Sequence, residues 1–191
     1  MRAILQQPDF RKLWLAQLVS IVGDFLALFG VISLITFRWR GNAMQVTFVM
    51  VSYMLPLALI GPLAGVFVDR WNVKRVMIAS DLTRAALVLL AVIATDVRQI
   101  CAIFAALGAF SSFFGPAQSV TVRTLVPMEK LLAANAMMAQ AFYTVRLLSP
   151  VLAGALIAWL GETPCFYLNS ASFVSICFAV FLVKSGILTV S

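Results

Sequence analysis

Six long runs of apolar residues follow one another along this chain, and short polar connections separate them. Each run holds about 20 residues, which is the length an α-helix needs to cross the ~30 Å hydrocarbon core of a bilayer. The apolar positions are continuous rather than alternating, so the strands of a membrane β-barrel are excluded. We predict six transmembrane helices, at Trp14–Phe37, Val46–Val68, Val76–Thr95, Ile100–Val120, Ala133–Leu160 and Phe166–Val183.

Composition supports a membrane protein. Hydrophobic residues make up 63% of the chain and charged residues only 11%, whereas soluble domains carry roughly 25% charged residues. We therefore expect an all-α membrane protein whose residues 1–191 form a single six-helix transmembrane bundle in contact with the lipid bilayer. The gaps between the helices are too short to hold a soluble domain.

Basic residues are unevenly divided between the two sides of this bundle. Nine lie at the amino end, the even-numbered connections and the carboxyl end, and only Arg38, Arg40 and Arg98 lie on the other side. By the positive-inside rule, both termini are expected in the cytoplasm of a multi-pass protein of the cell's inner (plasma) membrane. Because topology accounts for the net charge of +7, we expect no nucleic-acid partner.

Residues suited to metal binding or catalysis are sparse. The chain has no histidine, and Cys101, Cys165 and Cys177 lie in or beside apolar helices without metal-ligand spacing. We expect these cysteines to be small buried hydrophobic residues. The sequence therefore predicts no metal site, no cofactor and no enzymatic activity.

The first helix carries polar residues on one face, because Gln17, Ser20 and Asp24 are spaced by three and four residues. Asp24 lies ten residues from Trp14, about 15 Å along the helix and so near the bilayer midplane. A carboxylate at that depth costs at least ~2.5–3.5 kcal/mol and faces a cavity or a partner. It is either a buried hydrogen-bonding group or part of a substrate or proton pathway.

The fifth helix holds a second charge near mid-depth, Arg146, on a face shared with Asn135. Pro150, with Gly154 one turn later, predicts a kink there, because proline cannot bond the carbonyl four residues back. We expect Asp24 and Arg146 to approach within ion-pair or water-bridged distance. Protonation of Asp24 would then release Arg146 for an anionic group of a substrate. The alternative is two separate structural contacts.

The third and fourth helices carry weaker signals. Asp81 and Arg84 are three residues apart and are predicted to form a local ion pair that reaches interfacial water and extends a charged turn. The fourth helix has a stripe of small residues typical of close packing. Ser111 and Gln118 lie on a neighbouring face, where they could line a polar cavity.

Three segments carry a family resemblance. Three stretches, the turn Gly61–Arg75, the segment Gly115–Asn135 and the segment Arg146–Phe173, resemble in order and spacing the amino-terminal half of major facilitator superfamily transporters. The similarity is to the drug and siderophore exporter branch, which includes enterobactin exporters and macrolide efflux pumps. The turn has Asn72 where the family usually has glycine, and we expect asparagine to keep a left-handed backbone there. Ser149 likewise replaces a usual glycine.

The resemblance implies a secondary active, proton-coupled exporter of drugs or siderophore-like small molecules. In such transporters the charged turn latches against the other half of the molecule, a role that falls here to Gly65, Asp69, Arg70, Lys74 and Arg75. A complete transporter has two six-helix bundles with the substrate between them. We therefore expect the partner to be a carboxyl-terminal half or a second copy of this chain. The alternatives are a truncated fragment that does not transport and a membrane scaffold.

Overall fold

The computed structural model of the chain describes residues 7–182, and these residues form six long helices. All six are long and apolar enough to cross a membrane, which confirms the predicted fold class. They are α2 (Pro8–Ser33, continued by the π-helical turn η1, Leu34–Arg38), α3 (Ala43–Val68), α4 (Val73–Ile93), α5 (Val97–Leu125), α6 (Leu131–Leu160, preceded by the 3-10 turn η2, Met128–Lys130) and α7 (Thr163–Leu182).

Local chemistry explains where several helices begin. Proline stands at the first position of α2, where its missing N–H is not needed. Asn42 caps α3 in a reciprocal arrangement: its side chain accepts from the Gln45 N–H at 3.1 Å, and the Gln45 side chain accepts from the Asn42 N–H at 3.2 Å. These caps satisfy N–H groups that have no partner within the helix.

The turn between α3 and α4 differs from the sequence-based expectation. Asn72 has an extended backbone, with φ −68° and ψ 106°, so the expected left-handed conformation is wrong. Its side chain instead accepts a hydrogen bond from the Arg75 N–H at 3.1 Å. Asn72 is therefore the N-cap residue of α4, and its side-chain oxygen satisfies a backbone N–H of the first helical turn.

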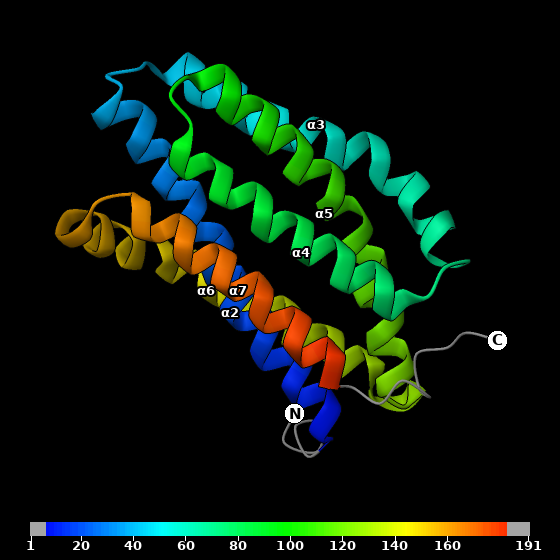
Figure 1. The fold of residues 1–191 in the computed structure, drawn as a ribbon. Helices are drawn as coiled ribbons and strands as arrows, with labels where there is room; N and C mark the ends of the chain where they lie inside the picture. Colours follow the sequence, from blue (N-terminus) through cyan, green and yellow to red (C-terminus); the bar gives the residue numbers. More distant parts are fainter. Residues whose placement is uncertain (1–6, 183–191) are drawn as a thin grey trace.

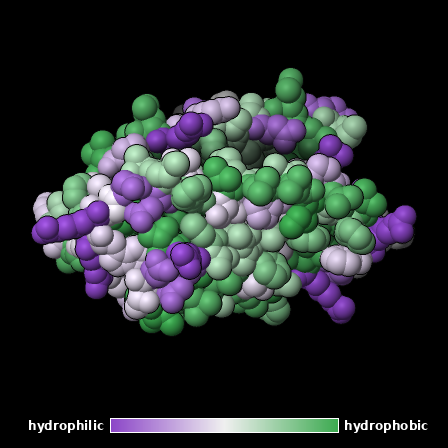
Figure 2. Space-filling view, turned by 90° about the horizontal axis from the view of Figure 1, so that it is seen from above, coloured by the Kyte–Doolittle hydropathy of each residue, from purple (hydrophilic) through white to green (hydrophobic). Residues whose placement is uncertain are grey.

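The helices pack as a series of neighbours, α3 on α5, α5 on α4, α4 on α7, α7 on α2 and α2 on α6 (Figure 1). The two outer members of the series are the least covered. Within its most apolar stretch α3 is only 11% buried and the span containing α6 22%, against 56% for the span containing α2. Figure 2 shows hydrophobic side chains over much of one face, with hydrophilic ones mostly toward the two ends.

Three buried apolar clusters hold the bundle together, and the two larger ones join most of its helices. One joins residues such as Leu13, Met77 and Ile176, and the other joins Val31, Val88 and Phe166. In each of α2, α4 and α7, residues of the first cluster lie toward one end of the helix and residues of the second cluster toward the other end. Polar residues occupy the stretch between them: Asp24 on α2, Asp81 and Arg84 on α4, and Asn169 and Ser172 on α7.

Glycine permits close helix approach at two crossings. A Cβ on Gly108 of α5 would clash with the Tyr53 backbone carbonyl of α3, and a Cβ on Gly23 of α2 would clash with Ser172 of α7. Part of the predicted small-residue stripe of α5 is thus confirmed as a packing surface. Gly115, farther along the same helix, has nothing within 4 Å of the position of a Cβ.

Candidate functional site

A cavity of about 700 Å³ opens in the middle of the bundle, and every one of the six helices contributes to its wall. Most of the wall is aromatic or aliphatic, and α2, α3, α5, α6 and α7 each contribute an aromatic ring or methionine. The polar lining residues are Gln17, Asp24, Arg84, Ser111, Arg146 and Asn169, together with the hydroxyl of Tyr53. The cavity thus combines an apolar wall with a few polar groups, the usual composition of a small-molecule site.

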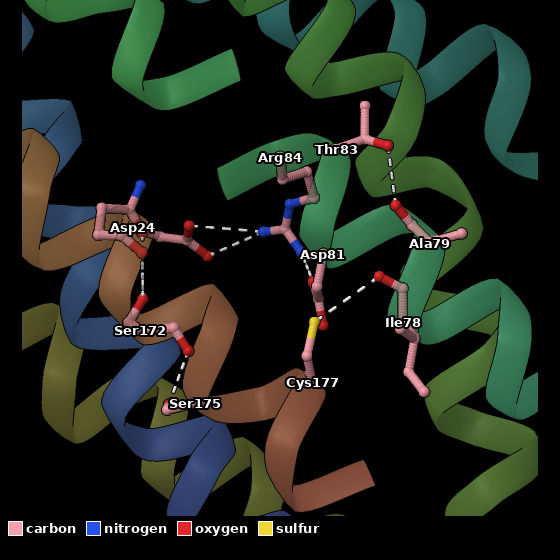
Figure 3. Close-up of polar contacts among 10 residues, drawn as sticks. Asp24, Ile78, Ala79, Asp81, Thr83, Arg84, Ser172, Ser175 and Cys177 are labelled. Carbon is pink, nitrogen blue, oxygen red and sulfur yellow. Dashed lines mark hydrogen bonds and ion pairs between the residues drawn. The ribbon is translucent and has the colours of Figure 1, made fainter. Parts of the chain in front are cut away.

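The charged centre of the cavity is a cluster of Asp24, Arg84 and Asp81. Arg84 Nη1 donates to Asp81 Oδ1 at 2.9 Å, and Arg84 Nη2 donates to Asp24 Oδ2 at 3.3 Å and to Oδ1 at 3.5 Å. Figure 3 shows the guanidinium between the two carboxylates, which come from α4 and α2. One arginine therefore bridges two acids on different helices.

Two aromatic rings fix the Arg84 guanidinium in place. Its central carbon lies 4.0 Å from the centroid of the Phe173 ring and 5.3 Å from that of Phe114, distances at which a cation is attracted to a ring face. Arg84 is 5% exposed and Asp81 is 0% exposed. The Asp24 side chain is 42% accessible, since it lies on the cavity wall.

Asp24 has a different partner from the one predicted. Among residues 7–182 its ion pair is with Arg84 and none joins it to Arg146. The ion-pair form of the prediction is therefore wrong, while a water-bridged approach across the shared cavity stays a prediction. Arg146 is exposed and lines the same cavity from α6, and it takes part in no ion pair within the described part of the chain. The two charges share a cavity without touching.

The local pair of Asp81 and Arg84 is confirmed, but its predicted surroundings are wrong. The two side chains are buried among helices rather than in interfacial water. The reason lies in the start of α4, which begins at Val73 and not at Val76. Arg84 is then eleven residues into the helix, about 16 Å at 1.5 Å per residue, and its contacts with Asp24 show that the two side chains lie at the same level of the bundle. The spacing of three residues was enough to predict the pair of Asp81 and Arg84. How far the pair lies from the end of the helix became clear only from the observed start of α4 at Val73.

The other predicted pathway residues divide into two groups. Gln17 and Ser111 line the cavity, and the Gln17 Oε1 and Ser111 Oγ atoms are buried without a hydrogen-bond partner among the described residues. Ser20 is buried, Gln118 half-buried and Asn135 exposed, and all three lie outside the cavity lining. Sequence reasoning missed Arg84, Tyr53 and Asn169 as lining residues.

Pro150 lies inside α6, which continues through it without interruption to Leu160. Pro150 lines the cavity, one helical turn after Arg146. Ser149 is buried, and its hydroxyl donates to the Val145 carbonyl at 2.7 Å. Gly154 has open space where a Cβ would stand. The predicted kink at Pro150 and Gly154 stays a prediction.

The charged turn after α3 is partly engaged within this chain. Lys74 Nζ donates to the Phe181 carbonyl of α7 at 2.8 Å and lies 5.4 Å from the Phe181 ring centroid. Trp71 stacks on Phe113 of α5, with ring centroids 6.3 Å apart. By contrast, Asp69, Arg70 and Arg75 are exposed and make no ion pair among residues 7–182. Gly65 has nothing within 4 Å of a Cβ position.

Comparison of the amino-acid sequence with known proteins assigns the chain to a family. The family model described as transmembrane secretion effector, one of the major facilitator (MFS) families, matches residues 2–188. The chain belongs to the major facilitator superfamily. Six membrane-spanning helices and this membership make it a multi-pass membrane protein of a transporter family, whose members are generally not enzymes.

Several curated MFS relatives align with the chain over part of their length. An uncharacterised MFS-type transporter of Bacillus subtilis, YfiS, is 28% identical over 88% of this chain and 42% of its own length. Macrolide efflux protein A of Streptococcus pyogenes is 30% identical over 64% of this chain and 31% of its own length. An uncharacterised MFS-type transporter of Mycobacterium tuberculosis is 28% identical over 70% of this chain and 32% of its own length. The chain thus spans less than half the length of these relatives.

Proposed function

We propose that this chain forms the amino-terminal six-helix half of a secondary active exporter in the cell's inner membrane, with both termini in the cytoplasm. The observation that carries the proposal is the cavity of about 700 Å³, whose charged lining residues lie near the middle of their apolar spans. Transporters place their substrate sites at this depth, between two helical bundles. A charged group inside a membrane marks such a pathway more often than a structural contact.

The proposed substrate is an amphiphilic small molecule of the drug or siderophore-like kind. Its apolar part would contact rings such as Phe25, Phe104 and Phe142, which line the cavity. Arg146 would bind an anionic group of the substrate, because it is exposed on the same wall and has no acidic partner among residues 7–182. The name of the Streptococcus pyogenes relative supports efflux of a lipophilic drug.

Proton coupling is proposed through Asp24. This carboxylate faces the cavity, where water can reach it, and its two contacts with Arg84 are long, at 3.3 and 3.5 Å. A proton taken up at Asp24 changes the charge of the cavity wall by one unit, which changes the relative stability of two transporter conformations. Gln17 is proposed to lie on the same pathway, since it lines the same wall.

The second half of the transporter is proposed to be a carboxyl-terminal six-helix half or a second copy of this chain. The poorly covered helices α3 and α6 supply the surface for it. Asp69, Arg70 and Arg75, which follow the end of α3, are exposed. Together with Gly65 and Lys74 they would form the cytoplasmic latch that contacts the second half. A few ion pairs at such an interface are worth at most a few kcal/mol, which biases a conformational equilibrium without locking it.

Co-expression tests this proposal. Cells producing the chain with a six-helix carboxyl-terminal half are expected to expel a lipophilic or siderophore-like compound that carries an anionic group faster than cells producing either part alone. Replacing Asp69 with Asn should lower that efflux, because the latch loses a charge, whereas Asp96→Asn, at an exposed helix start on the α4–α5 connection, should not. Crosslinking in membranes shows whether the partner is the added half or a second copy. Failure to find either partner would favour the scaffold or inactive-fragment alternatives.

A further inference from the structure

We propose that Arg84 and Asp81 are positioning residues that set the proton affinity of Asp24, and that the three residues together bind one proton. This inference rests on the proposed function for its purpose, but the proton occupancy of the cluster is measurable without transport. The argument uses the net charge of the cluster, its geometry and its access to water.

Charge counting gives the number of protons. Two carboxylates, Asp24 and Asp81, share one guanidinium, so the cluster carries one excess negative charge when both acids are ionised. Arg146 lines the same cavity but makes no ion pair with either acid among residues 7–182, so this excess charge has no direct partner, which is costly in the membrane interior. One proton brings the cluster to neutrality, and a second would make it positive. The cluster is therefore built for the uptake of a single proton.

The geometry selects Asp24 as the acid that exchanges the proton. Asp81 makes the shorter contact with Arg84, at 2.9 Å, and is completely buried. Arg84 is held against Phe173 and Phe114 and remains beside Asp81. Asp24 has longer contacts and faces the cavity. It can therefore separate from Arg84 without dismantling the buried pair.

The proton transfer step is simple. A hydronium ion that enters the cavity gives its proton to a carboxylate oxygen of Asp24 and leaves as water, and the two contacts from Arg84 Nη2 to Asp24 are given up. Arg84 keeps its Nη1 contact with Asp81, so the charge of the cluster goes from −1 to zero. Two buried atoms, Arg84 Nε and Asp81 Oδ2, have no hydrogen-bond partner among the described residues. The Arg84 N–H at Nε can still donate a hydrogen bond and Asp81 Oδ2 can still accept one, so the two side chains can form a further contact when Asp24 leaves.

Other groups that face Asp24 come from four helices. Tyr53 of α3 and Arg146 of α6 line the same cavity, Arg84 and Asp81 belong to α4, and α7 places Asn169 in the lining. Cys177 of α7 lies beside the cluster, where its Sγ contacts the Ile78 carbonyl at 3.6 Å (Figure 3). The residues of α5 in the lining carry no charge. The acids closest to the exchange are therefore Asp24 and Asp81.

The test is infrared spectroscopy of the purified full chain in lipid nanodiscs as the pH is varied. The protonated-carboxyl band that disappears in Asp24→Asn, but not in the exposed control Asp96→Asn, reports the proton on Asp24. In Asp81→Asn the remaining pair is already neutral, so this band should titrate at lower pH than in the parent chain, by at least about one pH unit. In Arg84→Gln two acids face each other without a cation, so carboxyl protonation should persist to higher pH.

Opposite displacements in Asp81→Asn and Arg84→Gln would support the proposal, because a merely structural contact would not set the direction of a titration. Arg84→Lys keeps the positive charge and should titrate like the parent chain. If Arg84→Gln does not fold, the downward displacement in Asp81→Asn and its absence in Arg84→Lys carry the test. An unchanged titration in Asp81→Asn would overturn the proposal, as would a band that responds to sodium ions rather than to pH. If the displacements occur while co-expression yields no efflux, the proton site stands and the transport proposal fails.

Discussion

Two aspartates of one cluster have different environments, and these environments decide what each can do. Asp81 is fully buried against Arg84, while Asp24 keeps 42% of its side chain open to the cavity. Removing the partner of a buried charge costs several kcal/mol, so Asp81 is suited to a fixed role. Asp24 is suited to exchange. That Asp24 faces a cavity or a partner could be predicted from a carboxylate within an apolar helix, but the identity of its partner could not, because residue spacing says nothing of which helices become neighbours.

Gly23 allows a prediction about close packing. A methyl group there would clash with the Ser172 hydroxyl and lie 2.8 Å from the Asn169 Oδ1 atom, so Gly23→Ala should push α2 away from α7. We expect a loss of about 1–3 kcal/mol, typical of overpacking, seen as a lower thermal unfolding midpoint in detergent. The matched control is Gly115→Ala, where the added methyl meets open space and stability should hold or rise slightly. Equal behaviour of both variants would contradict the packing argument.

At the level of elements, the six helices follow directly from the apolar runs, while their ends depend on local caps. The first helix begins at Pro8 rather than Trp14, and the fourth predicted helix extends to Leu125 rather than Val120. Both extensions run through polar and charged residues, which a hydropathy pattern assigns to connections. The π-helical turn Leu34–Arg38 has no recognisable sequence signal. Misplacing the start of α4 by three residues was enough to misplace Arg84 relative to the membrane surface.

The cap of α4 gives a prediction at this scale. Asn72→Ala removes the oxygen that accepts from the Arg75 N–H and should destabilise the chain by about 1 kcal/mol. Asn72→Gly, the residue usual in the family, should cost only a few tenths of a kcal/mol, since glycine is tolerated at helix caps. Chemical denaturation of the three proteins in the same detergent measures the difference. A larger loss for glycine than for alanine would mean that backbone freedom, not the cap, controls this turn.

The contact of Lys74 with the end of α7 gives a second prediction for the turn. Its ammonium group lies at a helix carboxyl end, where a positive charge is favourable by about 0.3–1 kcal/mol. Lys74→Met should lower the free energy of unfolding by an amount in this range, and high salt should reduce the difference. Arg75→Met, which removes an exposed charge one residue later, is the control and should have a smaller effect. A loss of stability in Lys74→Met alone would reflect the contact of Lys74 with α7. Equal losses in Lys74→Met and Arg75→Met would contradict a specific role for that contact.

For the molecule as a whole, the helix order explains both the cavity and the exposed edges. With α3 and α6 at opposite ends of the packing series, each has one side without a neighbouring helix of this chain. The sequence predicted a polar face on single helices, such as that of Asp24. It did not predict which residues of other helices line the cavity opposite that face. The family resemblance supplied the expectation of a site between two six-helix bundles, of which this chain would form one wall. The side chains that meet there, above all Arg84 with Asp24, required the three-dimensional arrangement.

Orientation in the membrane is the remaining whole-molecule prediction. Asp96 lies at the start of α5 and Arg123 near its end, so the two exposed residues are separated by 27 residues of helix, about 40 Å. The distribution of basic residues predicts that Asp96 lies outside the cell and Arg123 inside. In intact cells a membrane-impermeant thiol reagent should therefore label Asp96→Cys, whereas Arg123→Cys should react only after the membrane is opened. The parent chain, whose buried Cys165 and Cys177 and half-buried Cys101 give the background signal, is the control. The reverse labelling pattern would invert the topology and place the charged turn on the outer surface, where the proposed cytoplasmic latch could not operate.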